Sequence, residues 1–168
     1  MLSNKLQKEL NNQMNNEFFA EYEYLSMAAY FHAGNLDGIA NYFHVQAQEE
    51  HFHAMKIFHF ILDKGGKVEL QQIAKPDVDF ASPIAVFEKA LAHEQKVTKS
   101  INDLMDEAIK ENDHAVNSFL KWYVDEQVEE EASASKALGK MQIIGGKGEG
   151  LLMMDQEFAG RSFTAPAE

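Results

Sequence analysis

Polar residues with the chemistry of metal ligands recur in the two halves of this 168-residue chain. When the sequence is shifted by 77 positions against itself, three such residues of the first half align with three of the second: Glu17 with Glu94, Glu50 with Gln127, and His53 with Glu130. Each half therefore offers one carboxylate followed by a pair of polar side chains. The pair begins 33 positions after the carboxylate, and its two members lie one helical turn apart. Helical bundles hold metal ions in this way, with one helix supplying a single carboxylate and its neighbour supplying the pair. Two such units facing each other predict a site for two metal ions.

The six aligned residues are expected to lie inside the protein, because apolar residues flank them at helical spacing in each of four periodic segments. The alternative is that each is an ordinary solvated residue and that the apolar stripe lies elsewhere on its helix. Four carboxylates in an apolar interior repel one another, and each buried charge is costly unless a cation offsets it. Two divalent ions supply that offset, and mixed oxygen and imidazole ligands suit iron, manganese or, less specifically, zinc. The neutral amide of Gln127 is a poor ligand, so we expect one metal to be held more weakly than the other.

Four further residues lie beside the predicted ligands, and two interpretations stay open for them. Tyr24 follows Glu17 by two helical turns on the same face. It either hydrogen-bonds a ligand or donates an electron, or it is a core aromatic residue. Glu49, Glu126 and Glu129 flank the ligand pairs on one side. They form either a solvated acidic face or an accessory site for a third metal ion.

Apolar residues at alternating spacings of three and four predict four long helices, which cover approximately residues 6–31, 36–63, 82–108 and 113–141. Signals for helix ends support these limits. Gly34 ends the first helix, and Asn35 or Asp37 is expected to cap the second. Ser82 precedes Pro83, which is the order of an N-cap and a first helical residue.

The lengths of the connections predict the topology. The breaks at Gly34 and at 112–113 are short, so the first and second helices, and the third and fourth, should be antiparallel neighbours. The 18 residues of 64–81 reach about 60 Å when extended, whereas a helix of about 28 residues spans about 42 Å. A four-helix bundle with one long crossover satisfies both lengths. We therefore expect an all-α protein in one domain, with these limits: the domain 1–168, the bundle about 6–144, and a short fifth helix about 150–160.

The composition excludes several classes of function. The formal charge of −12 argues against a nucleic-acid partner, because nucleic-acid-binding proteins neutralise phosphates with basic residues. No apolar run approaches the roughly 20 residues that cross a bilayer, so we expect no membrane partner. The chain has no cysteine, which excludes disulfides and cysteine-ligated metal sites. Together with an N-terminus that shows no signal-peptide pattern, this predicts a cytoplasmic protein.

These residues resemble those of the bacterial non-haem ferritins, and the resemblance covers essentially the whole chain. Besides the ligand spacing, four stretches carry it: QAQEE at 46–50, HEQ at 93–95, FLKWYV at 119–124 and EGLL at 149–152. The resemblance implies a ferritin-like four-helix bundle that assembles into a hollow homo-oligomer of 24 subunits. It also implies an iron-storage protein that oxidises Fe(II) with dioxygen or hydrogen peroxide and stores a ferric oxyhydroxide mineral.

The resemblance further implies a role for each site residue. The residues group by the iron ion that they would bind: Glu17, Glu50 and His53 for the first position of a ferroxidase centre; Glu50, Glu94 and Glu130, with Gln127 beside them, for the second; Glu49, Glu126, Glu129 and Glu130 for a third. Tyr24 resembles the tyrosine next to that centre. Haem-binding relatives carry a methionine where this chain has His51, so we expect no haem. A catalytically silent metal store and a di-metal oxygenase or catalase-like enzyme stay open as alternatives.

Overall fold

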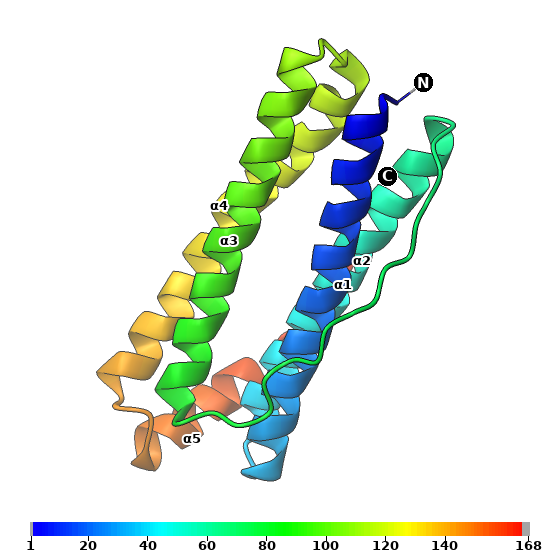
Figure 1. Cartoon of the computed structure of the whole chain (residues 1–168). Helices are drawn as coiled ribbons and strands as arrows, with labels where there is room; N and C mark the ends of the chain where they lie inside the picture. Colours follow the sequence, from blue (N-terminus) through cyan, green and yellow to red (C-terminus); the bar gives the residue numbers. More distant parts are fainter. Residues whose placement is uncertain (1, 166–168) are drawn as a thin grey trace.

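The computed structural model describes residues 2–165, and this part of the chain folds into five α-helices without a strand. The helices in chain order are α1 (Asn4–Ala33), α2 (Asp37–Asp63), α3 (Pro83–Lys110), α4 (His114–Ile143) and α5 (Gly148–Phe158). The four long helices form a bundle in which α1 packs against α2 and α3 packs against α4, and α5 crosses one end (Figure 1). The predicted all-α class and the predicted bundle with a fifth helix are confirmed.

Two helices begin where their capping residues predict. The Ser82 hydroxyl accepts a 3.1 Å hydrogen bond from the backbone N–H of Ala85, and Pro83 opens α3. At the start of α4, a carboxylate oxygen of Asp113 accepts a 3.1 Å hydrogen bond from the backbone N–H of Val116. Each cap satisfies a backbone donor that has no partner within the helix, which is typically worth about 1 kcal/mol.

The start of α2 differs from the prediction. Its N-cap position is Leu36, which makes no side-chain capping hydrogen bond. Asn35 instead adopts the left-handed conformation (φ 59°) that turns the chain after α1. The first turn is capped from α5, where Asp155 Oδ1 accepts a 2.8 Å hydrogen bond from the backbone N–H of Ile39. The prediction of a cap at Asn35 or Asp37 was therefore wrong, because the acceptor comes from a distant part of the chain.

The crossover between α2 and α3 runs the length of the bundle beside α1 (Figure 1). The side-chain amide of Asn11 holds its first part, donating to the carbonyl of Lys67 at 3.0 Å and accepting from the N–H of Glu69 at 2.6 Å. Near the other end, the Ser26 hydroxyl donates to the carbonyl of Asp77 at 2.5 Å. These bonds satisfy backbone groups of a segment that has no regular secondary structure. The predicted long crossover is confirmed.

A layer of buried polar side chains divides the apolar core into two clusters. On α1, Met14 belongs to one cluster and Tyr24 to the other, and Glu17 lies between them. On α3, Val97 and Ala90 mark the two clusters in the same way, and a buried glutamate lies between them as well. The same order holds on α2 and α4. The polar layer therefore lies at mid-height of the bundle, with apolar packing above and below it.

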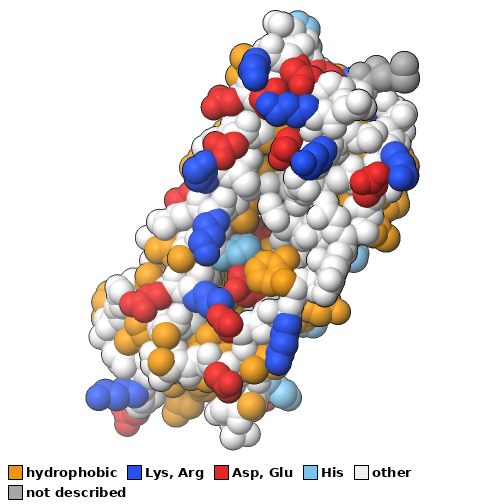
Figure 2. Space-filling view, in the orientation of Figure 1, with side chains coloured by type: hydrophobic (Ala, Val, Ile, Leu, Met, Phe, Trp, Pro, Cys, Tyr) orange, Lys and Arg blue, Asp and Glu red, His pale blue; other side chains and the backbone are white. Residues whose placement is uncertain are grey.

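The surface is mixed in character. On the face shown in Figure 2, acidic and basic side chains are interspersed and apolar side chains lie in small groups. Among the described residues, the structure contains no helix that is both long and apolar enough to cross a membrane.

The contact between α2 and α5 leads to a first prediction. A Cβ atom on Gly38 would lie 1.7 Å from the carbonyl oxygen of Asp155, so Gly38→Ala should force the two helices apart. We expect the free energy of unfolding to fall by at least about 2 kcal/mol, measured by chemical denaturation followed by circular dichroism. Gly139→Ala in α4 is the matched control, because its Cβ would meet no atom of the described residues within 4 Å, and alanine favours the helix. Equal stability of the two variants would contradict this account of the contact.

Candidate metal centre

The six aligned polar residues come from all four long helices and are buried at the level of the polar layer. Their side chains are nearly inaccessible, with exposed fractions between 1% and 6%: Glu17, Glu50, His53, Glu94, Gln127 and Glu130. The alternative in which these residues lie on solvated helix faces does not apply to this structure. Burial of four carboxylates in one layer demands compensation by hydrogen bonds, by protons or by cations.

One group of three ligands lies between α1 and α2. Ligand atoms of Glu17, Glu50 and His53 all lie within 4.8 Å of one another, with His53 Nδ1 3.4 Å from Glu50 Oε2. Oε2 of Glu17 and Oε2 of Glu50 are buried and accept no hydrogen bond from any residue in 2–165. An unpaired buried carboxylate oxygen is unfavourable, and a cation coordinated by both oxygens would remove that cost. The donor set of two carboxylates and one imidazole fits a transition-metal ion.

A second group links α2 to α4. Ligand atoms of His53, Glu126 and Glu130 also lie within 4.8 Å of one another. His53 therefore takes part in both groups, which places the two potential metal positions side by side. Glu130 is oriented by the side-chain amide of Gln46, which donates to Glu130 Oε2 at 3.0 Å. Because Gln46 is neutral, it fixes this carboxylate without replacing the charge of a cation.

Glu94 is held by two hydrogen-bond donors. The hydroxyl of Tyr24 donates to Glu94 Oε1, and Nε2 of Gln127 donates to Glu94 Oε2 at 3.2 Å. Glu94 belongs to neither group of close ligand atoms, although it is buried in the same layer. In this arrangement Gln127 orients the carboxylate of Glu94. Tyr24 also hydrogen-bonds Glu94, as expected if it contacts a metal ligand.

The carboxylates of the layer affect one another's protonation. Burial raises the pKa of the Glu50 carboxyl well above its usual range, and the charges of Glu94, Glu17 and Glu130 raise it further. Burial also raises the pKa of the Glu94 carboxyl to about 7, with Glu130 as the next cause. In the metal-free protein, protons therefore neutralise part of this layer at neutral pH. A metal ion would have to displace them.

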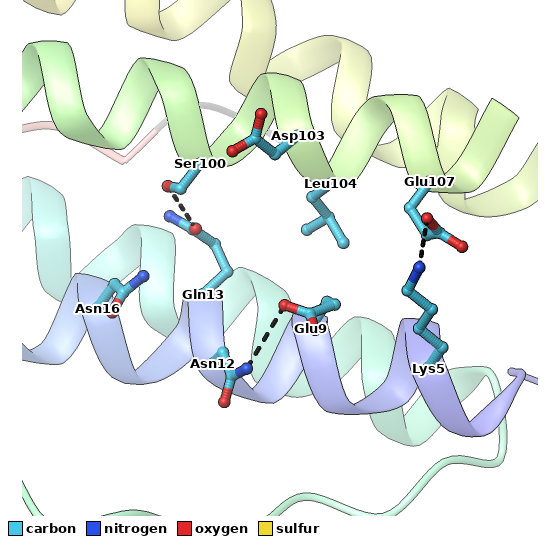
Figure 3. A pocket seen from close by; sticks show the side chains of 9 residues that line it. All are labelled: Lys5, Glu9, Asn12, Gln13, Asn16, Ser100, Asp103, Leu104 and Glu107. Atoms are coloured by element: carbon cyan, nitrogen blue, oxygen red, sulfur yellow. Dashed lines mark hydrogen bonds and ion pairs between the residues drawn. The ribbon is translucent and has the colours of Figure 1, made fainter. Parts of the chain in front are cut away.

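Two supporting amides were not predicted. The Nε2 of Gln13 donates to Glu17 Oε1 at 2.8 Å, and Gln13 Oε1 accepts a 2.7 Å hydrogen bond from the hydroxyl of Ser100 on α3. Figure 3 shows the hydrogen bond between Gln13 and Ser100, which joins α1 to α3 at the edge of a polar cavity. Gln13 precedes Glu17 by four residues, as Gln46 precedes Glu50. That one-turn spacing could have identified the bond of Gln13 to Glu17, whereas Gln46 bonds Glu130 on another helix and not Glu50.

A buried ion pair next to the centre was also not predicted. His93, which precedes Glu94, showed no partner pattern in the sequence. Its Nδ1 lies 2.9 Å from Glu23 Oε2, and its ring meets the ring of Tyr24 edge-on, with the centroids 5.8 Å apart. Lys89 Nζ lies 2.8 Å from the other oxygen of Glu23. Only the adjacency of His93 to Glu94 and of Glu23 to Tyr24 hinted at this pair.

The three acidic residues predicted to flank the ligands occupy different environments. Glu126 belongs to the second group described above. Glu129 is exposed on α4 and belongs to neither group. Glu49 forms an ion pair with Arg161 of the C-terminal segment, at 2.7 Å between Oε2 and Nη2. Burial raises the pKa of the Glu49 carboxyl to about 7, although the nearby guanidinium lowers it.

Comparisons with known proteins agree with this geometry. Residues 7–144 match the ferritin family, described as a ferritin-like domain. The chain is 40% identical over 163 residues to a bacterial non-heme ferritin of Staphylococcus aureus, covering 97% of this chain and 98% of that protein. It is 41% identical to the corresponding protein of Staphylococcus haemolyticus, with the same coverage. An engineered closed form of the Archaeoglobus fulgidus ferritin superposes with a TM-score of 0.96 at 45% identity, covering 98% of this chain and 100% of that chain. An open-pore ferritin of the same archaeon superposes with a TM-score of 0.95 at 44% identity, covering 96% and 100%.

The pKa of Glu94 leads to a second prediction, which concerns the metal-free protein. A carboxyl whose pKa rises from 4.5 in the unfolded chain to about 7 in the folded one binds its proton more tightly when folded. Its contribution to stability is complete below about pH 4.5 and is lost as the pH rises to about 7. Since glutamine does not ionise, Glu94→Gln should raise the free energy of unfolding more at pH 8 than at pH 5, by on the order of 3 kcal/mol.

This difference can be measured by chemical denaturation of chelator-treated protein, with all variants at the same protein concentration. Glu88→Gln is the matched control, because Glu88 is an exposed glutamate on the same helix. It should show the same stability difference from the unsubstituted protein at both pH values. A Glu94→Gln effect that does not change with pH would refute the prediction.

Proposed function

The chain belongs to the ferritin family, and we propose on this basis that it is an iron-storage ferritin with ferroxidase activity. It oxidises Fe(II) to Fe(III) at the centre inside each bundle and keeps the product as a ferric oxyhydroxide mineral in a hollow shell. The observation that carries this proposal is the group of Glu17, Glu50 and His53, whose ligand atoms lie within 4.8 Å in a buried layer. Carboxylates favour hard ferric ions over ferrous ions, so this ligand set favours the oxidised product.

The two iron ions are assigned to the positions that the carboxylates define. Glu17, Glu50 and His53 bind the first ion. Glu50, Glu94 and Glu130 bind the second ion, with Gln127 beside it as a weak ligand or an orienting group. The raised pKa of Glu50, caused by burial and then by Glu94, Glu17 and Glu130, supports this assignment, because it reflects the proximity of these four charges. The weaker second position favours exchange of iron over permanent retention.

Two Fe(II) ions each give up one electron, and the two electrons together with two protons reduce dioxygen to hydrogen peroxide, or hydrogen peroxide to two molecules of water. The protein contributes ligand geometry and a site shielded by the apolar clusters above and below it. Tyr24 positions Glu94 through its hydroxyl and lies close enough to the centre to donate an electron. Glu126 and Glu129, together with Glu49, form an accessory position through which the ferric product leaves. Hydrolysis of ferric iron releases protons, which carboxylates along this route can accept.

The assembly and compartment belong to the same proposal. The chain forms one domain and assembles into a homo-oligomer of 24 subunits, as its resemblance to the bacterial non-haem ferritins implies. Iron is its substrate and cargo, and no haem is required. The proposed location is the cytoplasm.

A third prediction tests the ligand assignment. His53→Ala removes the side chain that takes part in both ligand groups, so Fe(II) added to metal-free protein in air should be oxidised at least about tenfold more slowly. Glu94→Ala should have a similar effect. Ferric absorbance in a stopped-flow instrument measures the rate, and electron microscopy measures the mineral core. His59→Ala is the matched control, since His59 is exposed on the same helix, and it should oxidise iron at the normal rate.

The same experiment separates the alternatives. Fast oxidation with a mineral core supports the proposed ferritin function. Iron binding without oxidation identifies a catalytically silent store, and oxidation without retained mineral identifies an oxygenase or catalase-like enzyme. Normal oxidation by His53→Ala would show that the ligand assignment is incorrect.

A further inference from the structure

A second cavity, of about 280 Å³, lies beside the metal centre where the C-terminal segment meets α2. Glu49, His53 and Glu126 line it from the helices, and residues 162–164 line it from the C-terminal segment. His53 and Glu126 belong to the second group of close ligand atoms. The cavity therefore lies between the second ligand group and residues 162–164. The ligand assignment gives these three residues no role.

Arg161 fixes this segment to α2 by its charge. Its Nη2 atom lies 2.7 Å from Glu49 Oε2, and both side chains are largely buried. The guanidinium also lies over the ring of Tyr42, at 4.5 Å from the centroid. A guanidinium above an aromatic ring gains cation–π attraction, and an ion pair away from solvent is screened less than one on the surface. The carbonyl of Arg161 accepts a 2.9 Å hydrogen bond from the amide of Asn41.

The helix that precedes the segment is itself anchored. The rings of Phe158 and Tyr42 stack with centroids 4.5 Å apart, and Asp155 caps α2 as described above. Beyond Arg161, the ring of Phe163 packs against Phe52 with centroids 5.9 Å apart. The segment is therefore attached at Arg161 and at Phe163 and forms one wall of the cavity.

One cation thus already neutralises Glu49. The guanidinium lies 2.7 Å from Oε2 of Glu49, so a metal ion that coordinated this oxygen would compete with Arg161 for its negative charge. Residues 162–164 line the same cavity, so they restrict the paths by which an ion could reach Glu49. We propose that Arg161 is an internal counter-ion that competes with a third divalent cation for Glu49, and that residues 161–164 form a lid over that cation's position.

The proposal rests on the proposed function, because it takes Glu126 and Glu130 as the other ligands of the third ion. With Arg161 in place, its charge cancels that of Glu49, and the cavity attracts a divalent cation less strongly. When the lid opens, Glu49 adds its full negative charge. The lid therefore makes the third position weaker than the two positions of the centre, so that it fills only after them.

The test is Arg161→Gln, which removes the charge and keeps a hydrogen-bonding side chain of moderate length. Zn(II) is used as a redox-silent probe in calorimetric titrations of the metal-free assembly. We expect the affinity for the third ion per subunit to rise at least about tenfold, with little change for the first two. Lys140→Gln is the matched control, because Lys140 forms an ion pair with Glu157 of α5 away from the cavity. It removes the same charge and should leave all affinities unchanged.

Two further variants test the mechanism. Glu49→Gln should weaken the third ion and should abolish the gain when combined with Arg161→Gln. Phe163→Ala removes the contact with Phe52 and should speed binding of the third ion, measured by stopped flow with Co(II) as a coloured probe. An unchanged third affinity in Arg161→Gln, or an equal gain in Lys140→Gln, would overturn the role of Arg161. An unchanged rate in Phe163→Ala would overturn the lid.

The outcomes distinguish this inference from the function on which it rests. If the unsubstituted protein binds two ions and oxidises Fe(II), but Arg161→Gln binds the third ion no more tightly, only the inference fails. If the unsubstituted protein neither binds two ions nor oxidises Fe(II), the proposed function fails with it.

Discussion

Mutual repulsion of buried carboxylates is the constraint on which the rest of this structure depends. Glu17, Glu50, Glu94 and Glu130 lie in one nearly inaccessible layer between two apolar clusters. Their charges cannot all be present together without compensation in such surroundings. Protons supply it in the metal-free protein, as the raised pKa values of Glu50 and Glu94 indicate. Metal ions would supply this compensation in the loaded protein, so metal binding would release protons from these carboxyl groups.

Hydrogen bonds from neutral donors orient the carboxylates of this layer without reducing its negative charge. Gln13, Gln46 and Gln127 each donate a hydrogen bond to a different carboxylate, and Tyr24 donates to Glu94. A lysine or arginine at any of these positions would also orient a carboxylate, but it would take the place of a metal ion electrostatically. Cationic side chains pair instead with carboxylates beside the centre, Arg161 with Glu49 and Lys89 with Glu23. Neither Glu49 nor Glu23 is one of the four carboxylates of the layer itself.

The sequence predicted the features that depend on local spacing. Helix limits at Ser82 and Asp113 follow from capping chemistry within a few residues, and the internal duplication located the buried ligands because periodicity reports which face of a helix is inward. Contacts between distant segments could not be predicted. Asp155 caps α2 from 116 residues away, and Arg161 pairs with Glu49 from 112 residues away. Neither contact produces a periodic pattern in the sequence, because each depends on where α5 packs against α2.

The order of the helices has a consequence for how the centre matures during synthesis. The ribosome releases the N-terminal hairpin of α1 and α2 before the C-terminal half, because synthesis runs from the N-terminus. That hairpin alone contains Glu17, Glu50 and His53, so the first ligand group is present while the C-terminal half is still being translated. The second group needs Glu126 and Glu130 from α4, and it can form only after the crossover has brought the late hairpin alongside. On the proposed ligand assignment, which takes Glu94 from α3 and Glu130 from α4 for the second ion, the first iron position can therefore form before the second.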